Sequence, residues 1–336
     1  MIICNLYIST AQPVYQHGQL RVEGAHIVDM DGHKVALRGI SLGWHNWWPQ
    51  FYTPSIVEYL SHDWDISIIR VAMGVEPTDG YLENPEKSER IIRTVIDAAI
   101  ANGIYVIVDW HSHTIHTGEA QLFFSTIAQQ YSGHPNIIYE IFNEPEGNIS
   151  WEEIREYSIS IIQSIREYDN HNLIIVPTPT WSQDVDMAAG DPILDYSNIL
   201  YSLHFYAASH EHLRPKVEYA VKMGLPIFVS ECSPSAANGN GKLDKKRFSR
   251  WLEFLKQNDI GFVLWGLYDK EESSAMLKPG SNDPAKWPLG QLTEMGAYSR
   301  LIVSGKRDPT KTVFIIGVIF IAVIVLAQKL KKNIAI

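Results

Sequence analysis

Eight short apolar runs recur along the chain and alternate with stretches of helical periodicity. Each run is continuously apolar rather than alternating, which is typical of parallel strands covered by helices. The runs occupy residues 35–42, 66–73, 105–111, 137–142, 173–178, 199–206, 227–231 and 262–267. Eight strands alternating with helices predict an α/β fold, a single (β/α)8 or TIM barrel.

The segments between these runs carry apolar residues at helical spacing. In residues 89–102 the apolar positions fall on one helix face, which predicts a helix there. Ser150 followed by Glu153 is a capping box, so a second helix is expected over residues 150–169. Another apolar stripe predicts a helix over residues 245–257.

A β-hairpin is predicted ahead of the first barrel strand. Residues 19–34 have strand-like patterning, and Asp31-Gly32 is a favourable turn dipeptide. A hairpin in this position would close the bottom of the barrel. No repeat or low-complexity segment interrupts residues 14–305, which we therefore interpret as one domain.

The N-terminal segment is apolar and ends in small residues. Residues 1–12 finish in Ser9-Thr10-Ala11, a pattern like a signal-peptidase site, although no basic region precedes the apolar stretch. We interpret residues 1–12 as the remnant of a signal peptide. An unstructured N-terminus is the alternative.

The C-terminal segment predicts a membrane anchor. Residues 313–327 are uncharged and apolar on all sides, short of the roughly 20 residues of a relaxed span but sufficient when flanking residues snorkel. We therefore expect a juxtamembrane linker over residues 306–312, a transmembrane C-terminal hydrophobic helix over 313–328 and a short basic tail over 329–336. A buried core helix is the alternative, and it fits poorly outside the barrel pattern.

Composition narrows the classes of partner. The formal net charge is −10 and no Lys/Arg stripe crosses the main body, which argues against nucleic-acid binding. Several of the 10 Trp and 16 Tyr residues lie in polar, turn-like segments, which suits the binding of flat sugar faces. Cys4 and Cys232 are not expected to pair, so cysteine usage is compatible with either redox compartment.

Polar side chains gather where the predicted strands end. In barrels of this type the active site lies at the carboxyl ends of the strands. Burying many ionisable groups there is costly unless they pair or function. The residues at these ends are Arg70, Asp109, His111, Asn143, Glu144, His204, Tyr206, Glu231 and Trp265.

Two carboxylates follow strands on opposite sides of the predicted barrel mouth. Glu144 ends the fourth strand and Glu231 ends the seventh. Retaining glycosidases place two carboxyl groups about 5–5.5 Å apart, and inverting ones about 6.5–9.5 Å apart. Arg70 is expected to hold Glu231 ionised by charge pairing. A buried Arg–Glu ion pair without catalysis is the alternative.

Four motifs give the chain a resemblance to a known family. They are IFNEP around Glu144, LHFY around His204, VSE at Glu231 and the tract YDKEESSAMLKPG ending at Gly280. With these motifs, residues 17–305 resemble glycoside hydrolase family 5, close to its bacterial-type cellulase branch. The resemblance implies endo-acting hydrolysis of internal β-1,4-glucosidic bonds in cellulose or related β-glucans. It also implies a retaining double displacement without metal or organic cofactor, and we expect a monomer.

The resemblance implies roles for the residues at the strand ends. Glu144 resembles the acid/base and Glu231 the nucleophile, with Asn143 binding the sugar 2-hydroxyl. The positions that would orient Glu231 or line the −1 subsite are Arg70, Tyr206, His111 and His204.

The resemblance also implies that Trp265 forms the platform under the −1 sugar, with a cis peptide just after it. Softer binding roles follow for four further residues, and packing alone is the alternative for each of these. Trp47 would stack on the glycone side and Trp181 on the aglycone side, while Lys270 and Glu272 would hydrogen-bond sugars.

Several alternatives remain open. The tract over residues 270–280 favours β-1,4-glucan as the polymer that is cleaved. Mannan, mixed-linkage glucan and xyloglucan are the alternatives. A metal-dependent barrel hydrolase would use the crowded loop that carries Asp109, His111, His113 and His116. A membrane-tethered carbohydrate-binding protein without turnover is the third class. Because polymeric sugar lies outside the cell, we expect an extracellular or cell-surface location.

Overall fold

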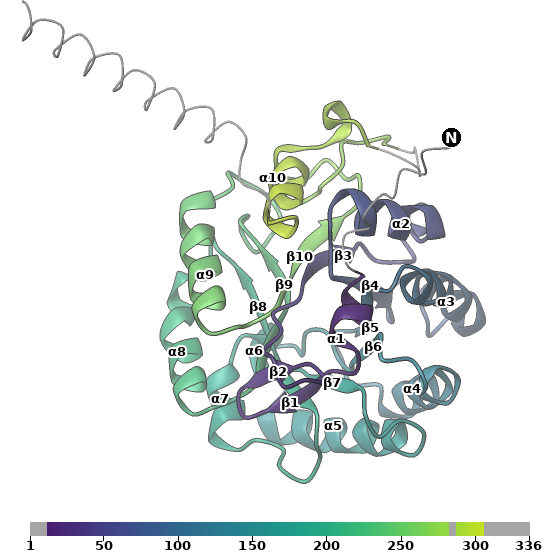
Figure 1. Ribbon diagram of the computed structural model, residues 1–336, viewed down its shortest axis with the longest axis vertical. Coiled ribbons are helices and arrows are strands. Elements are labelled where there is room, and N and C mark those ends of the chain that lie inside the picture. Colours follow the sequence, from purple (N-terminus) through teal and green to yellow (C-terminus); the bar gives the residue numbers. More distant parts are fainter. Residues whose placement is uncertain (1–11, 282–286, 306–336) are drawn as a thin grey trace, which may run out of the picture.

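The computed structural model describes residues 12–281 and 287–305 (Figure 1). Except for Gln12, the expected signal-peptide remnant lies outside these residues, and so do the linker, the apolar segment and the basic tail over residues 306–336. Within the described part, no helix has the length and apolarity needed to cross a membrane.

Eight parallel strands close into a barrel, so the predicted fold class is confirmed. The closed order is β10-β3-β4-β5-β6-β7-β8-β9, and every neighbouring pair is parallel. The strands are β3 (Arg38–Leu42), β4 (Ile68–Gly74), β5 (Tyr105–His111), β6 (Ile137–Glu140), β7 (Leu173–Val176), β8 (Ile199–Tyr206), β9 (Ile227–Ser233) and β10 (Phe262–Leu267). Every residue of seven of these strands is buried, and only Arg38 in β3 is exposed.

Helices cover the outside of the barrel (Figure 1). The capping box at Ser150 and Glu153 is present, and the helix expected over 245–257 has those bounds. The helix expected over 89–102 begins earlier because Pro85 suits its first turn. The helices are α1 (Pro13–His17), α2 (Pro54–Asp63), α3 (Pro85–Ala101), α4 (Thr117–Tyr131), α5 (Trp151–Arg166), α6 (Pro179–Ser182), α7 (Val185–Gly190), α8 (Arg214–Lys222), α9 (Lys245–Gln257) and α10 (Glu294–Val303), with 3-10 turns η1 (Pro49–Phe51), η2 (Glu211–Leu213) and η3 (Leu289–Gln291).

The N-terminal hairpin exists, but its two strands are not joined at the predicted Asp31-Gly32 turn, which instead connects the antiparallel partners Val28 and Lys34. Strands β1 (Arg21–Glu23) and β2 (His26–Val28) are joined at Gly24-Ala25, where Gly24 adopts a φ of 59° that favours glycine. Asp31-Gly32 forms a separate turn instead, because the Asp29 carboxylate accepts hydrogen bonds from the backbone of Asp31 and His33.

The hairpin region closes the lower end of the barrel, as expected. Leu20 and Ile27 are buried in an apolar cluster with inward-facing strand residues such as Ile68, Tyr105 and Phe228. A second and larger apolar cluster fills the space between the barrel and its helices. At the carboxyl ends of the strands, called the upper end below, polar side chains occupy the interior of the barrel.

Candidate active site

Strand register brings the predicted polar residues to one level at the upper end of the barrel. Asp109 of β5 pairs with Glu140 of β6, and His204 of β8 pairs with Glu231 of β9. Glu144 follows β6 in an irregular segment whose backbone bonds to the neighbouring β5 loop, from Glu144 N to Ser112 O at 3.2 Å. Side chains distant in sequence therefore converge in one small volume.

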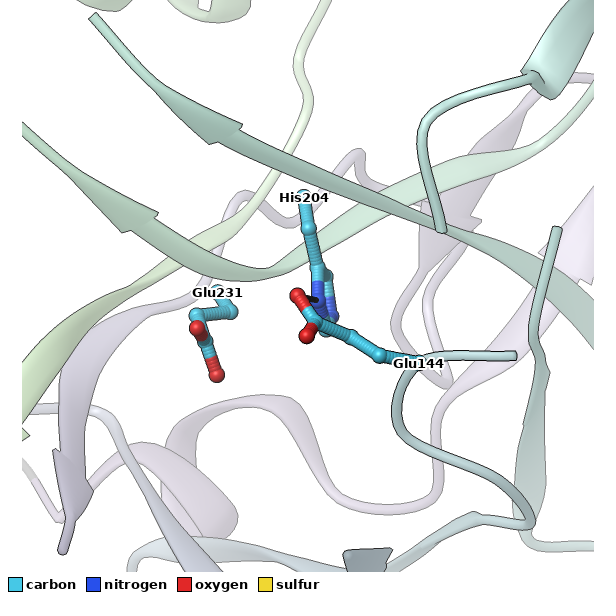
Figure 2. A group of neighbouring side chains, drawn as sticks. All are labelled: Glu144, His204 and Glu231. Atoms are coloured by element: carbon cyan, nitrogen blue, oxygen red, sulfur yellow. Dashed lines mark hydrogen bonds and ion pairs between the residues drawn. The ribbon is translucent and has the colours of Figure 1, made fainter. Parts of the chain in front are cut away.

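The two glutamates face one another in this volume (Figure 2). One carboxylate oxygen of Glu144, one of Glu231 and one ring nitrogen of His204 all lie within 4.8 Å of each other. The Glu231 side chain is 6% exposed, whereas that of Glu144 is 17% exposed. This proximity is consistent with the carboxyl spacing of about 5–5.5 Å in retaining glycosidases. Inverting glycosidases have a wider spacing, which leaves room for a water molecule.

Arg70 is the charged centre of the site and is fully buried. Its Nε donates to Glu140 Oε2 at 2.6 Å, and one terminal nitrogen donates to Glu231 Oε2 at 2.9 Å. The other terminal nitrogen donates to Asn143 Oδ1 at 2.7 Å and lies 3.0 Å from Asp109 Oδ2. Burial lowers the pKa of Arg70, but the three carboxylates raise it overall, so the guanidinium stays charged.

Glu231 receives a donor on each carboxylate oxygen. The Tyr206 hydroxyl donates to Oε1 at 2.5 Å, and Arg70 donates to Oε2. Burial and the nearby Glu144 carboxylate raise the pKa of Glu231, while His204, Arg70 and the Tyr206 hydroxyl oppose that rise. The hydrogen bonds therefore favour the ionised form that burial penalises.

His204 lies beside Glu144 at the centre of the site. Its Nδ1 is 2.9 Å from Glu144 Oε1, and its Nε2 is 2.9 Å from Ser230 Oγ and 3.5 Å from Glu140 Oε1. Burial lowers the pKa of His204, but hydrogen bonds to Glu140 and Glu144 and the charge of Glu231 raise it to about 9. The raised pKa favours the imidazolium form, which can donate from both nitrogens.

His111 is held differently. Its Nδ1 lies 2.6 Å from Asp109 Oδ2, and its ring stacks parallel to that of Trp265 at 5.4 Å. Burial and the charge of Arg70 hold the pKa of His111 well below its usual value, so the ring is neutral. The Trp265–Gly266 peptide bond is cis, as the resemblance implied.

Two adjoining hollows open at the site. One is lined by Trp47, Trp265, Lys270 and Glu272, all four of which were predicted sugar-binding residues. The other is lined by Trp181, together with Glu144, His113, Gln183 and His210. Tyr206 and Ala237 line both hollows, so they adjoin at the site. Trp47 and Trp181 are 52% and 41% exposed, which leaves part of each ring available to a ligand.

Several contacts of the site could not be predicted from the sequence. Glu140 is fully buried against Arg70, and the available signal was a single acid within an otherwise apolar strand. His113 lies 3.9 Å from Glu144 Oε2, and Trp44 stacks on Trp47 at 4.7 Å. Only the fold could reveal the last two contacts, because loops bring these residues in.

The histidine-rich loop does not gather as a ligand set. His111 contacts Asp109, while His113 contacts Glu144 and His116 lies 3.4 Å from Glu76. Within the described residues, the group with ligand atoms mutually within 4.8 Å is the set shown in Figure 2. The metal-ligating arrangement considered for this loop is therefore not formed.

The fold and site together define a class of protein. A closed parallel barrel holds two close carboxylates at the carboxyl ends of its strands, between two aromatic-lined hollows. This is the arrangement of a glycoside hydrolase.

Comparison with known proteins makes the assignment specific. The family model "Cellulase (glycosyl hydrolase family 5)" matches residues 28–271, and the chain belongs to this family. Endoglucanase N of Pectobacterium atrosepticum is 39% identical over 298 residues, which cover 87% of this chain and 66% of that protein. An endoglucanase of Clostridium saccharobutylicum is 37% identical over 315 residues, 92% of this chain and 70% of that protein. The chain thus spans about two thirds of these relatives.

Solved structures agree with this assignment. A protein from Cytophaga hutchinsonii is 40% identical, with a TM-score of 0.85 over 90% of this chain and 99% of that chain. The catalytic domain of a Thermobifida fusca endoglucanase is 32% identical, with a TM-score of 0.82 over 87% of this chain and 99% of that chain. The barrel is therefore the catalytic unit of an endo-acting β-glucan hydrolase.

Proposed function

We propose that this chain cleaves internal β-1,4-glucosidic bonds of cellulose or a related β-glucan with retention of configuration. Glu231 acts as the nucleophile and Glu144 as the acid/base. The observation that carries this proposal is the close approach of the two carboxylates, with donors from Arg70 and Tyr206 on Glu231. The endoglucanase relatives support the choice of polymer.

The reaction proceeds by double displacement. Glu231 attacks C1 of the sugar in the −1 position, and the C1–O4 bond breaks as Glu144 gives its proton to O4. The resulting glycosyl-enzyme is inverted at C1. Ionised Glu144 then takes a proton from water, the water oxygen attacks C1, and the bond to Glu231 breaks. The two inversions give net retention.

The two acids have different hydrogen-bond partners. Arg70 and Tyr206 hydrogen-bond the ionised form of Glu231 and keep it available for attack. His204 holds a proton beside Glu144 Oε1, which stabilises the carboxylate form that Glu144 adopts after it has donated its own. Asn143, fixed by Arg70, is placed to bind the sugar 2-hydroxyl.

Two adjoining hollows support endo action, because sugars must be held on both sides of the cleaved bond. Trp265 and Trp47 offer aromatic faces on the glycone side, with Lys270 and Glu272 as hydrogen-bonding groups, and Trp181 offers one on the aglycone side. The Thermobifida fusca catalytic domain has also been solved in complex with cellotetraose. That ligand supports a β-glucan chain as the substrate of this protein.

Hydrolysis of cellopentaose by residues 12–305, followed by anomer-resolved NMR, tests bond type and stereochemistry together. Retained β-anomer is expected, and inversion would refute the assigned roles.

Glu231→Gln should abolish turnover and leave oligosaccharide binding intact. A variant that keeps most of its rate would remove Glu231 from the mechanism. A panel of soluble mannan, mixed-linkage glucan and xyloglucan assayed for reducing ends decides the preferred polymer.

We also propose an extracellular or cell-surface enzyme that acts as a monomer and is anchored through residues 313–328. The support is the uncharged apolar composition of that segment and the polymeric nature of the substrate. Fractionation of the full chain and of residues 1–305 tests this proposal. Full chain recovered with membranes, and the shorter chain free of them, is the expected result. Equal recovery of both in the soluble fraction would refute anchoring.

A further inference from the structure

The segment that carries Trp181 has an unusual backbone. Thr180, Trp181 and Ser182 have φ values of 57°, 56° and 55°, so three consecutive residues with side chains lie in the left-handed region. Residues with side chains adopt this conformation at a cost in free energy relative to the right-handed one. The segment is formally part of α6, but it is a left-handed turn. A run of this kind persists only where surrounding contacts hold it.

Two hydrogen bonds attach this turn to the backbone on both sides of Glu144. The Ser182 hydroxyl donates to the carbonyl of Asn143 at 2.8 Å, and the Trp181 N–H donates to the carbonyl of Pro145 at 2.8 Å. Ser182 is fully buried, so its hydroxyl bond is shielded from water. The turn is therefore hydrogen-bonded to the residue before Glu144 and to the residue after it.

Side-chain contacts hold the turn from its other end. The Thr180 hydroxyl donates to Asp184 Oδ2 at 2.8 Å, and Lys216 of α8 donates to the second oxygen of the same carboxylate. The Trp181 ring packs over Gly147, where an added Cβ would lie 3.4 Å from the ring. The turn is thus tied to α8 on one side and to the Glu144 segment on the other.

We propose that this left-handed turn is a brace that sets the position of the Glu144 carboxyl, with Ser182 and Asp184 as positioning residues. The same turn presents Trp181 to the aglycone hollow beside Glu144. The aglycone platform Trp181 and the proton donor Glu144 are consequently held in a fixed relative position. A sugar stacked on Trp181 would therefore have its leaving oxygen placed next to the acid that protonates it. This inference rests on the proposed role of Glu144.

The test compares two substrates of nearly equal size that differ in their need for a proton. Phenyl β-cellobioside has a poor leaving group that requires protonation, whereas 2,4-dinitrophenyl β-cellobioside releases a stable phenolate without one. Their kcat/KM values report steps up to cleavage of the aryl bond. Ser182→Ala should lower kcat/KM for the phenyl substrate about tenfold and leave the dinitrophenyl substrate within about twofold. Thr180→Val, which frees Asp184, should show a smaller split in the same direction.

Thr178→Val is the matched control. The Thr178 hydroxyl is also buried and also donates to a backbone carbonyl, but its acceptor is Ser202 at 3.1 Å and not a residue of the Glu144 segment. This variant should leave the ratio of the two kcat/KM values unchanged. A parallel loss on both substrates in Ser182→Ala, or no loss on either, would overturn the brace.

Glu144→Gln distinguishes failure of the proposed brace from failure of the acid/base assignment. It should lose far more activity on the phenyl substrate than on the dinitrophenyl substrate. If it does and Ser182→Ala shows no split, only the brace is wrong. If Glu144→Gln itself shows no split, the acid/base assignment fails first.

Discussion

Arg70 donates from Nε to Glu140 Oε2 at 2.6 Å, and neither side chain has any exposed surface. Arg70 Nη1, one of its two remaining nitrogens, donates to Glu231. Glu140 thus supplies a countercharge deep in the barrel and fixes the guanidinium plane that presents a donor to the nucleophile. Its Oε1 also lies 3.5 Å from His204 Nε2, so one acid is close to both Arg70 and His204.

Glu140→Gln is therefore expected to damage both stability and activity. Removing one partner of a buried ion pair costs about 3–5 kcal/mol, an upper bound for this site because Asp109 and Glu231 still pair with Arg70. The free energy of unfolding, measured by urea denaturation, should fall by an amount in this range or slightly below it, because Gln keeps one acceptor. The initial rate on cello-oligosaccharide should fall with it. Glu146→Gln, at an exposed position two residues beyond Glu144, is the control. Equal stability of the two variants would contradict the role of Glu140.

Tyr206→Phe should move the acidic limb of the pH–rate profile. The Tyr206 hydroxyl lowers the pKa of Glu231 by donating to its carboxylate. Its loss raises that pKa, so kcat/KM should begin to fall at a higher pH as the solution is acidified. A hydrogen bond to a charged group contributes about 1.5–3 kcal/mol, which corresponds to a rate loss of about ten- to hundredfold. An unshifted acidic limb would show that Tyr206 does not act on the nucleophile.

Much of this fold could be predicted because the strands of a covered parallel barrel are continuous apolar runs. Their order along the chain then fixes which ends meet, so Glu144 and Glu231 could be paired although they lie 87 positions apart in the sequence. Glu140 was harder, because a lone acid in a strand does not reveal its partner. Its identity as the counterion of Arg70 depends on the lateral register of β4, β5 and β6.

Other features depend on tertiary contacts that leave no local pattern. Asp31-Gly32 is the better turn dipeptide, yet Gly24-Ala25 joins the hairpin because burial of Leu20 and Ile27 sets its register. The segment Thr180–Ser182 contains no glycine, so its left-handed conformation could not be predicted from the sequence. It exists because hydrogen bonds to Asn143 and Pro145 hold it in place.

His204 should make stability depend on pH above neutrality. Its pKa is raised from 6.5 to about 9 in the folded state, so the folded protein binds this proton more tightly than the unfolded chain. The stabilisation is present in full below about pH 6.5 and is lost as the pH rises through 9. A shift of this size is worth about 3 kcal/mol as an upper bound.

Urea denaturation at pH 6 and at pH 9.5 measures this dependence. The free energy of unfolding of the wild type should decrease between the two, and His204→Gln should show a smaller decrease because it carries no titrating ring. A wild-type stability that rises over this range would contradict the imidazolium assignment.

Gly239→Ala should weaken sugar binding on the glycone side. Gly239 has a φ of 78°, and an added Cβ would lie 2.2 Å from Glu272 Oε1, so the carboxylate must move. Glu272 also pairs with Lys270, and both line the glycone hollow. Because these groups lie away from the cleaved bond, their displacement should raise KM for cellopentaose several-fold while kcat stays nearly constant.

Gly241→Ala provides the control for backbone strain. Gly241 has a φ of 88°, but nothing lies within 4 Å of a Cβ at that position. Both variants carry the penalty of a side chain at positive φ, and only Gly239→Ala displaces Glu272. A KM that rises equally in both variants would attribute the effect to strain in the loop. A fall in kcat confined to Gly239→Ala would mean that Glu272 acts on the transition state rather than on binding alone.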